Sequence, residues 1–477
     1  MASQEWTRTT TYPVGSSTNP VDCRDLSIGS GADIQALGWL SMNRRGAFRR
    51  AGAGHGNGMV DETVPLLLNG YAWLPAMWRG ARGPAVRTRV LGQRAVALRG
   101  PDAVRFFYDE RHVRRHGAVP ELVQGTLFGH GAVHTLDGAE HRHRKDMFLS
   151  LLHPPARVTD LVDRVDTAWA AAVGSWPAGR QVVLFDEVSR ILTRGACDWA
   201  GITVADKDVD GLARDLVAMV DGFATPGPRH WRARLARGRR ERWLSGLVRD
   251  IREGEVRVAA GSPASVVAEL TGTDGALVPP ELAAVELLNL IRPTVAVSWF
   301  VAFAAHALHR WPQIRDRLRG PDPAYEIAFA HEVRRFYPFA PFVGGRAVTD
   351  LTWRGTPIPA GSLVLLDIFG QDHDAALWPR PYDFAPDRFL DRPPGRDELI
   401  PQGGGDPHTN HRCPGEDAAV ALLAVLGSRL ANLEYEVPPQ DLTIPLRRIP
   451  TLPRSRFVIT PRRTPVSALP ERLAVRA

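Results

Sequence analysis

One long apolar stretch constrains the fold more than any other part of this chain. It is PPELAAVELLNLIRPTVAVSWFVAFAAHALHRWP, which Pro279-Pro280 opens and Pro312 closes. The roughly 31 residues of helical character between these prolines make a helix ~45 Å long at 1.5 Å per residue, which is the full width of a domain. Pro293 lies in its interior, where it removes a backbone hydrogen bond at a cost of about 3 kcal/mol and kinks the helix. The fold must therefore be built around one long, kinked helix.

Arg292 stands beside that proline, on a helix otherwise apolar enough to be buried. An isolated buried guanidinium is very costly, so this charge needs a partner. One interpretation is a structural salt bridge, or a helix that reaches the surface at this point. The other is that Arg292 binds an anionic ligand through charge-assisted hydrogen bonds. The residues by themselves leave both open.

The rest of the chain predicts a mainly α-helical protein with a small β region. Apolar residues recur at three- and four-residue spacing in ARVTDLVDRVDTAWAAAV and DGLARDLVAMVDGF, which is typical of helices. Short β-like stretches interrupt this texture: VRTRVLGQRAVALRG, LTWRGTPIPAGSLVLLDIFG and SRFVIT. No internal repeat and no Gly/Ser linker divides the chain after residue 57. We expect a single large domain over residues 58–477, after a poorly ordered extension over residues 1–57.

Charge and cysteine content exclude several classes of protein. The net charge is +7, but the basic residues are nearly all arginine and are interleaved with acids, so no nucleic-acid partner is indicated. Cys23, Cys197 and Cys413 are far apart and odd in number, which fits neither a disulfide framework nor a CxxC metal site. No signal peptide and no integral membrane segment is expected. The segment NRRGAFRR is similar to a twin-arginine export signal, but AGAGHGNG follows where an apolar segment is needed, so we expect a cytoplasmic location.

The segment GGGDPHTNHRCPGE, residues 403–416, places a lone cysteine in a glycine-rich loop. Its glycines let the backbone approach a flat and bulky group. The segment EDAAVALLAVLGSRLANL continues the loop as an apolar-periodic helix, and the start of a helix favours the thiolate form of Cys413. Such a sulfur is suited to bind a metal ion. On its own, however, a glycine-rich loop with one cysteine is more often structural.

Two segments upstream give this loop its context. In HEVRRFYPF, Glu332 and Arg335 are three residues apart and share one helical face, and FAPDRF carries Arg388. Together with Cys413 and Gly415, and in this order, they resemble the cytochrome P-450 superfamily over roughly residues 60 to 465. The resemblance implies the fold of that superfamily, with the long kinked helix crossing over a haem b cofactor. It also implies that Cys413 is the thiolate ligand of the haem iron, which favours O–O cleavage, and that the Glu-Arg-Arg set forms a buried structural network.

Arg292 and Pro293 stand where most monooxygenases of this superfamily carry an acid followed by threonine for proton delivery. The replacement in LLNLIRPTVAVS resembles the branch of fatty-acid peroxygenases and decarboxylases, as do QGTLFGHGAVHTLDGAEHRHRKDMFLSL, EVRRFYPFAPF and PQGGGDPHTNHRC. This resemblance implies that Arg292 binds the carboxylate of a long-chain fatty acid, and that hydrogen peroxide replaces dioxygen, reductase and NAD(P)H. The bound carboxylate would satisfy the guanidinium and serve as the acid–base group for splitting peroxide. Oxidation is then expected at the α or β carbon.

His134 matches a position that holds histidine or glutamine close to the haem in this branch. Relatives with histidine include those that form terminal alkenes, whereas relatives with glutamine mostly hydroxylate. A radical at the β carbon either gains a hydroxyl group or loses an electron and carbon dioxide. An imidazole with an unperturbed pKa near 6.5 could bias that choice by proton supply. We expect a mixture of terminal alkenes and hydroxy fatty acids.

Several basic residues are candidates for contact with the haem propionates. His141 and Lys145, four residues apart on one helical face, match the helix that contacts a propionate. Arg346 in GGRAVTD matches a strand arginine with the same task. Beside the cysteine, either His411 or Arg412 is expected to reach a propionate. Each could instead be a solvated surface charge.

The remaining candidates concern space in the site. Gly405 and Gly415 are expected to give the porphyrin and the sulfur room. Phe128 and Phe339 are candidates for lining the acyl channel, although either could be plain core.

The resemblance thus implies a haem-thiolate enzyme that oxidises long-chain fatty acids with hydrogen peroxide and needs no redox partner. One alternative is a redox-partner-driven monooxygenase that acts on another carboxylic acid. A second is a non-catalytic haem protein that senses or carries fatty acids.

Overall fold

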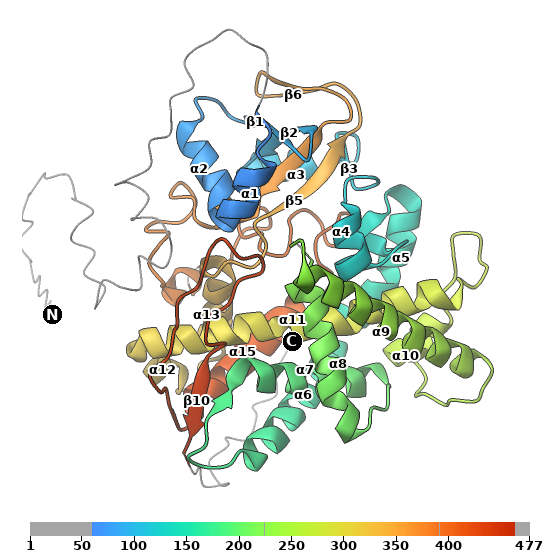
Figure 1. Ribbon diagram of the computed structural model, residues 1–477, viewed down its shortest axis with the longest axis vertical. Helices are drawn as coiled ribbons and strands as arrows, with labels where there is room; N and C mark the ends of the chain where they lie inside the picture. The colour runs from blue at the N-terminus through green and yellow to red at the C-terminus, as the bar shows by residue number, and fades with distance from the viewer. Residues whose placement is uncertain (1–59, 224, 391, 463–477) are drawn as a thin grey trace, which may run out of the picture. The chain divides into compact units, whose positions relative to one another are not determined.

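The computed structural model describes residues 60–223, 225–390 and 392–462 (Figure 1). The extension predicted over residues 1–57 lies outside the described residues. The largest hydrophobic core draws side chains from Val133 to Ile459, as one large domain requires.

Helices form most of the described structure, as predicted. The α-helices are α1 (Thr63–Asn69), α2 (Trp73–Gly80), α3 (Pro101–Tyr108), α4 (Glu121–Val123), α5 (Gly138–Leu152), α6 (Pro155–Ser175), α7 (Leu184–Ala200), α8 (Asp206–Asp221), α9 (Pro228–Arg252), α10 (Pro263–Ala268), α11 (Pro280–Arg310), α12 (Pro312–Leu318), α13 (Pro323–Phe336), α14 (Ile368–Asp372) and α15 (Glu416–Asn432). Short 3-10 or π turns are η3 (Gly70–Ala72), η4 (Gln124–Phe128), η5 (Val133–Thr135) and η6 (Pro386–Phe389). Of the two amphipathic patterns predicted from the sequence, the first falls within α6, and the second lies in α8 and runs two residues past its end at Asp221.

The predicted β stretches are confirmed as strands. The strands are β1 (Val86–Val90), β2 (Gln93–Leu98), β3 (Val113–Arg114), β4 (Val182–Val183), β5 (Phe342–Ala347), β6 (Leu351–Trp353), β7 (Thr356–Ile358), β8 (Leu363–Asp367), β9 (Tyr435–Glu436) and β10 (Val458–Pro461). They form a five-stranded sheet of order β1-β2-β8-β5-β3, a three-stranded sheet β4-β10-β9 and the pair β6-β7. Only the β2-β8 pairing of the large sheet is parallel.

The β1-β2 hairpin follows from its two-residue turn. Val90 pairs with Gln93, and Leu91 and Gly92 between them have φ values of 52° and 73°. Positive φ at both positions matches the twist of the flanking strands, and glycine adopts it at no steric cost.

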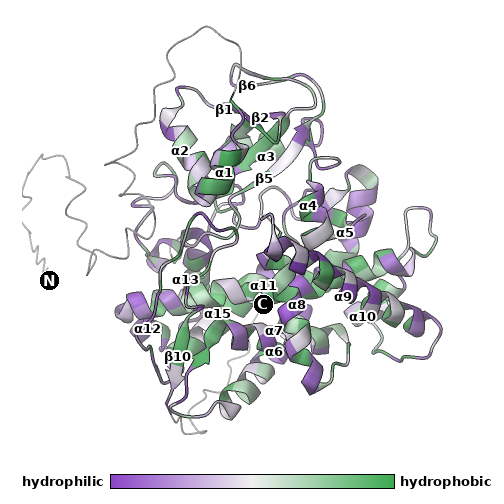
Figure 2. Ribbon diagram, in the orientation of Figure 1, coloured by the Kyte–Doolittle hydropathy of each residue, from purple (hydrophilic) through white to green (hydrophobic). Residues whose placement is uncertain are grey.

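The long helix α11 lies across the middle of the view in Figure 1 and packs against α7, α9 and α15. It continues through Pro293 without a break in the helix. Figure 2 shows it in hydrophobic colours among more polar surface helices. A stretch of α11 is long and apolar enough to cross a membrane, but 94% of that stretch is buried inside the protein. A helix that is apolar on all sides is buried in this way when it forms the core of a large domain.

Candidate active site

Cys413 lies at the end of the glycine-rich loop, just before α15. Its backbone N–H donates to the carbonyl oxygen of Gln402 at 3.1 Å, and the Nε2 amide of Gln402 lies 3.9 Å from its Sγ atom. Although part of its surface is accessible, burial raises the pKa of the Cys413 thiol above its ordinary value. A metal ion bound to the sulfur removes that proton. The sulfur is therefore better suited to be a metal ligand than a free nucleophile.

Any metal at Cys413 has to bring further ligands with it. Among residues 60–223, 225–390 and 392–462, no group of three or more His, Cys, Asp or Glu side chains could hold a metal ion. A haem would meet this condition, because its porphyrin would bring the other ligands of the iron and Cys413 would supply the sulfur.

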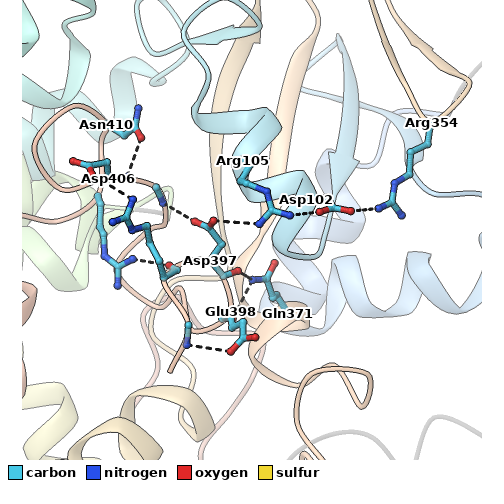
Figure 3. Close-up of polar contacts among 12 residues, drawn as sticks. Asp102, Arg105, Arg354, Gln371, Asp397, Glu398, Asp406 and Asn410 are labelled. Carbon is cyan, nitrogen blue, oxygen red and sulfur yellow. Dashed lines mark hydrogen bonds and ion pairs between the residues drawn. The ribbon is translucent and has the colours of Figure 1, made fainter. Parts of the chain in front are cut away.

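Polar side chains hold the backbone of the cysteine loop in place (Figure 3). Asp397 Oδ1 accepts a hydrogen bond from the N–H of Gly405 at 3.1 Å. Asn410 Oδ1 accepts one from the N–H of Asp406 at 2.9 Å. Asp397 also pairs with Arg105 of α3, with 3.5 Å between Oδ2 and Nη1. The loop is thereby attached to the β-rich part of the fold.

Three loop glycines pack against α3. A Cβ atom on Gly404 would lie 2.3 Å from Val104 Cγ1, and one on Gly403 would lie 2.8 Å from the hydroxyl of Tyr108. Gly405 has a φ of 79°, and its Cβ would lie 3.1 Å from Tyr108. Close packing and, at Gly403 and Gly405, a positive φ require glycine at these positions. That Gly405 also makes room for a cofactor stays a prediction.

Gly415 differs from these glycines. A Cβ atom there would meet Leu152 at 3.6 Å, an ordinary contact distance, as its nearest neighbour. That Gly415 leaves space beside the sulfur therefore stays a prediction, which these neighbours do not oppose.

A cluster of basic side chains lies beside the loop. The rings of His141 and His411 stack with centroids 3.9 Å apart, and His411 Nε2 lies 3.6 Å from Asp137 Oδ1. Burial lowers the pKa of His141 to about 3 and that of His411 to about 4, so both rings are neutral at physiological pH. Lys145 donates to the carbonyl oxygens of Asn410 and, at 2.7 Å, of Arg412. Lys145 thus binds the loop backbone next to the cysteine.

Arg412 points away from this cluster. Its Nε donates to Glu416 Oε2 at 2.7 Å and its Nη1 to the carbonyl oxygen of Arg396 at 2.6 Å. Of the two residues before the cysteine, His411 is therefore the one that lies with His141.

Arg346 lines a pocket together with Asp137, the partner of His411, and Arg115 lies close to the same cluster. Arg346 donates to the carbonyl oxygens of Gly117 at 2.7 Å and Gly361 at 3.0 Å, which leaves its guanidinium largely bonded to the protein. Arg115 was not predicted; it donates to the carbonyl oxygen of Gly344 at 2.5 Å, and its charge acts on His411. The sequence has many arginines, and no spacing distinguished this one.

Arg292 is almost completely buried on α11, so the alternative of a helix that surfaces here is wrong. Its Nη2 lies 3.4 Å from Asn289 Oδ1, a long hydrogen bond. Burial lowers the pKa of its guanidinium to about 9, nearby Arg237 lowers it further, and Cys413 opposes them.

Arg237 of α9 is a second buried arginine near Arg292, and the sequence analysis did not single it out. It pairs with Glu241 at 2.6 Å and donates to the carbonyl oxygens of Leu127 at 2.6 Å and Phe128 at 2.8 Å. Its partners are mostly backbone oxygens, which no sequence pattern reveals.

His134 lies in η5 and stacks on the ring of Phe128, with centroids 4.2 Å apart. Burial lowers the pKa of His134 well below 6.5, and the positive charges of Arg292, Arg237 and Lys145 act in the same direction. The expectation of an unperturbed pKa is therefore wrong, because the desolvated ring lies among cations. The neutral ring can still donate or accept one proton through its nitrogens.

Phe339 follows α13 and lies against α11. Its ring centroid lies 4.9 Å from that of Phe300, and its carbonyl oxygen accepts a hydrogen bond from the hydroxyl of Tyr71 at 2.6 Å. It is partly buried against the largest hydrophobic core.

Glu332, Arg335 and Arg388 come together as the sequence predicted. Glu332 is fully buried; its Oε2 accepts from Arg335 Nε at 2.7 Å and from Arg388 Nε at 3.1 Å. Its Oε1 accepts from Arg335 Nη2 at 2.7 Å and from the N–H of Ala385 at 2.8 Å. The carboxylate thus holds α13 to the segment around η6.

Several buried polar atoms of the residues around the cysteine loop and Arg292 have no hydrogen-bond partner within the described part of the chain. They include Tyr108 Oη, His134 Nδ1, His141 Nδ1, His411 Nε2 and Arg292 Nε. Native proteins bury few such atoms, because each one costs free energy. They fit a bound group that carries anionic substituents next to a metal ion, which describes haem together with an acidic substrate.

Comparisons with known proteins agree with this geometry. A family model described as Cytochrome P-450 matches residues 324–461. Cyclooctat-9-en-7-ol 5-monooxygenase of Streptomyces melanosporofaciens is 25% identical over 418 residues, which are 79% of this chain and 88% of that protein.

Solved structures match over more of the chain. Cytochrome P450SP alpha is 40% identical with a TM-score of 0.81, over 84% of this chain and 98% of that one. Cytochrome P450EX alpha, solved with myristic acid, is 34% identical with a TM-score of 0.81, over 85% of this chain and 97% of that one. A variant of OleT in complex with arachidonic acid is 32% identical with a TM-score of 0.82, over 85% of this chain and 97% of that one.

Proposed function

The chain belongs to the cytochrome P-450 family, in the branch of fatty-acid peroxygenases and decarboxylases, and from this we propose that it oxidises long-chain fatty acids with hydrogen peroxide at the α or β carbon. The products are hydroxy fatty acids and terminal alkenes. One peroxide is consumed in each turnover: a hydroxy acid forms with one water, and an alkene forms with carbon dioxide and two waters.

The buried guanidinium of Arg292 carries this proposal. It has one long hydrogen bond, to Asn289, and its Nε atom has no partner among the described residues. A fatty-acid carboxylate supplies what the guanidinium needs, a bidentate charge-assisted pair in a dry environment. A salt bridge within the protein, the alternative left open by the sequence, has no support from the contacts of Arg292.

Cys413 is proposed to hold the haem iron, with Gly415 beside it. When bound, the haem supplies the redox chemistry, and the thiolate donates electron density that favours O–O cleavage. The neutral rings of His141 and His411, with Lys145 and Arg115, are proposed to bind the propionates. Arg412 and Arg346 are bonded elsewhere, so their proposed contact with a propionate has the weakest support.

Arg292 and Pro293 are proposed to replace the usual proton-delivery pair. With its head group held by Arg292, the fatty acid presents its α and β carbons to the oxidising centre, and its carboxylate can accept and return a proton during cleavage of peroxide. Phe128 and Phe339 are proposed to line the acyl channel. His134, stacked on Phe128, is proposed to bias the choice between hydroxylation and decarboxylation.

The independence from a redox partner is part of the same proposal, since peroxide already supplies both the oxygen atom and the oxidising equivalents. The cytoplasmic location predicted from the sequence is also retained as a proposal.

Product analysis by gas chromatography tests the function. Purified haem-loaded protein is incubated with saturated fatty acids of graded length and hydrogen peroxide, without a reductase. Terminal alkenes, 2-hydroxy acids or 3-hydroxy acids are expected. Products that appear only with a ferredoxin and its reductase would favour the partner-driven monooxygenase. Fatty-acid-induced spectral changes without turnover in either system would favour the sensor.

A further inference from the structure

Three polar side chains stand at intervals of three residues on α11, where the helix is otherwise apolar. They are Glu286, Asn289 and Arg292, and their exposed fractions are 0%, 4% and 5%. Polar groups this deeply buried are normally bonded, because an unpaired one is costly. The contacts of the first two residues explain how the third is held.

Both carboxylate oxygens of Glu286 are bonded within the protein. Oε1 accepts from Arg144 Nη1 of α5 at 2.8 Å and from the N–H of Val133 at 2.9 Å. Oε2 accepts from Asn289 Nδ2 at 3.3 Å. Since Arg144 is itself only 3% exposed, the negative charge of Glu286 is balanced by Arg144 inside the protein.

The side-chain amide of Asn289 lies between Glu286 and Arg292. Its Nδ2 donates to two acceptors, Glu286 Oε2 and, at 2.8 Å, the carbonyl oxygen of Phe128. With the donor end bonded to two oxygens, the acceptor end Oδ1 is directed to Arg292 Nη2. The network also determines the amide orientation, because a reversed amide would place its oxygen against two other oxygens.

We propose that Asn289, held by Glu286 and Arg144, is the positioning residue that orients the guanidinium of Arg292 for a fatty-acid carboxylate. The inference rests on the proposed role of Arg292 as carboxylate anchor. In this proposal Asn289, Glu286 and Arg144 do not contact the substrate. They determine the orientation of the Arg292 guanidinium, which does.

A neutral amide is the chemistry that this position requires. A hydrogen bond to Asn289 Oδ1 restrains the long side chain of Arg292 before substrate binds. Without this bond, substrate binding would carry the entropy cost of ordering that side chain. A carboxylate at the position of Asn289 would also restrain Arg292. It would, however, neutralise the positive charge of the guanidinium and compete with the substrate carboxylate for it. The order Glu286, Asn289, Arg292 along α11 therefore orients the guanidinium and leaves its positive charge free to bind the substrate carboxylate.

The test measures the Kd of palmitate for the haem-loaded full chain, from the spectral change on binding. For Asn289→Ala we expect the Kd to rise roughly tenfold, as for a lost hydrogen bond to a charged group. For Asn289→Asp we expect a larger rise, because the new carboxylate pairs with Arg292. Asn69→Asp is the matched control: Asn69 ends helix α1, its Nδ2 donates to the carbonyl oxygen of Pro65, and the variant should bind palmitate as the unchanged chain does.

A second probe separates positioning from folding. Imidazole, which binds the haem iron without needing Arg292, should keep its Kd in both Asn289 variants, and the thermal midpoint should change little. Parallel losses of palmitate binding, imidazole binding and thermal stability would overturn the inference in favour of a structural role.

Arg292→Ala separates this inference from the proposed function. If Arg292→Ala weakens palmitate binding but both Asn289 variants bind normally, positioning by Asn289 is wrong and the carboxylate anchor stands. If Arg292→Ala itself binds palmitate normally, the anchor is wrong, and the positioning role is overturned with it.

Discussion

The imidazole ring of His134 lies nearly parallel to the ring of Phe128, with centroids 4.2 Å apart and 14° between the planes. The carbonyl oxygen of Phe128 accepts hydrogen bonds from Asn289 and Arg237, both at 2.8 Å. Through Phe128, His134 is therefore in contact with residues bonded to α9 and α11, the helices that carry Arg237 and Arg292. In this setting the ring is neutral at physiological pH, because burial and the neighbouring cations lower its pKa.

The product ratio should depend on His134. In His134→Gln we expect a smaller fraction of terminal alkene and a larger fraction of hydroxy acid, because glutamine cannot shuttle a proton as an imidazole does. Gas chromatography of the products from a single fatty acid measures the ratio. An unchanged ratio with normal total turnover would remove His134 from the proposed product-determining step.

Acid should destabilise the protein through His134. The pKa of the ring is lowered in the folded chain, so below about pH 6.5 the unfolded chain binds a proton that the folded chain does not, and stability falls with pH by at most about 1.4 kcal/mol per pH unit for one group. His134→Gln should therefore lose less stability than the unchanged chain between pH 7 and pH 5. Urea unfolding at each pH measures the difference, and an equal or steeper loss in the variant would contradict the lowered pKa.

Removal of the guanidinium should abolish most fatty-acid turnover. Arg292→Ala is expected to retain haem and its spectrum but to lose kcat/KM on the order of a hundredfold, as when one partner of a buried charge pair is truncated. Peroxide-driven assays measure this. Arg164→Ala, which removes a surface ion pair with Asp160, is the control and should be unaffected. Full activity in Arg292→Ala would show that the carboxylate is bound elsewhere.

The two described cysteines should behave differently. Cys413→Ala is expected to lose the thiolate–haem spectrum completely, since the other described cysteine, Cys197, is fully buried in the hydrophobic core. Cys197→Ala removes a fully buried thiol of the hydrophobic core and should keep the spectrum at a modest cost in stability. The carbon monoxide difference spectrum distinguishes the variants. A normal spectrum in Cys413→Ala would reject Cys413 as the ligand.

Loss of the buried carboxylate of Glu332 should prevent accumulation of the haem-loaded protein. Glu332→Ala leaves Arg335 and Arg388 without their shared anion, and breaking such a pair costs about 3–5 kcal/mol, which is comparable to the stability of a whole domain. Glu332→Gln keeps one acceptor oxygen, which can still bond Ala385 and Arg335, although its NH2 group cannot accept from Arg388, and it should be less severe. Yields of soluble haem protein measure both. Equal yields for the unchanged chain and Glu332→Ala would show that the network is dispensable.

Much of the fold could be predicted from local spacing. The prolines at both ends and the continuous apolar character determine α11, and a two-residue turn with glycine determines the β1-β2 hairpin. The trio of Glu332, Arg335 and Arg388 could be predicted because each member lies in a short recognisable segment. These features depend on neighbours in the chain, and the chain order of residues shows them directly.

Other features depend on neighbours that are distant in the chain. Arg412 and His411 are adjacent, yet one bonds Glu416 and the other stacks on His141. Gly405 follows a packing requirement set by Tyr108, some three hundred residues earlier.

By itself the sequence determined the long core helix and the segments that carry Glu332, Arg335 and Arg388. It made Cys413 a candidate metal ligand and left open whether Arg292 is buried, which the structure then showed. Only the tertiary structure decided the protonation of His134 and the orientation of Arg292 through Asn289. The physical reason is that desolvation and hydrogen-bond direction depend on every element packed around a group, and those elements come from α5, α9, α11 and the turns η4 and η5.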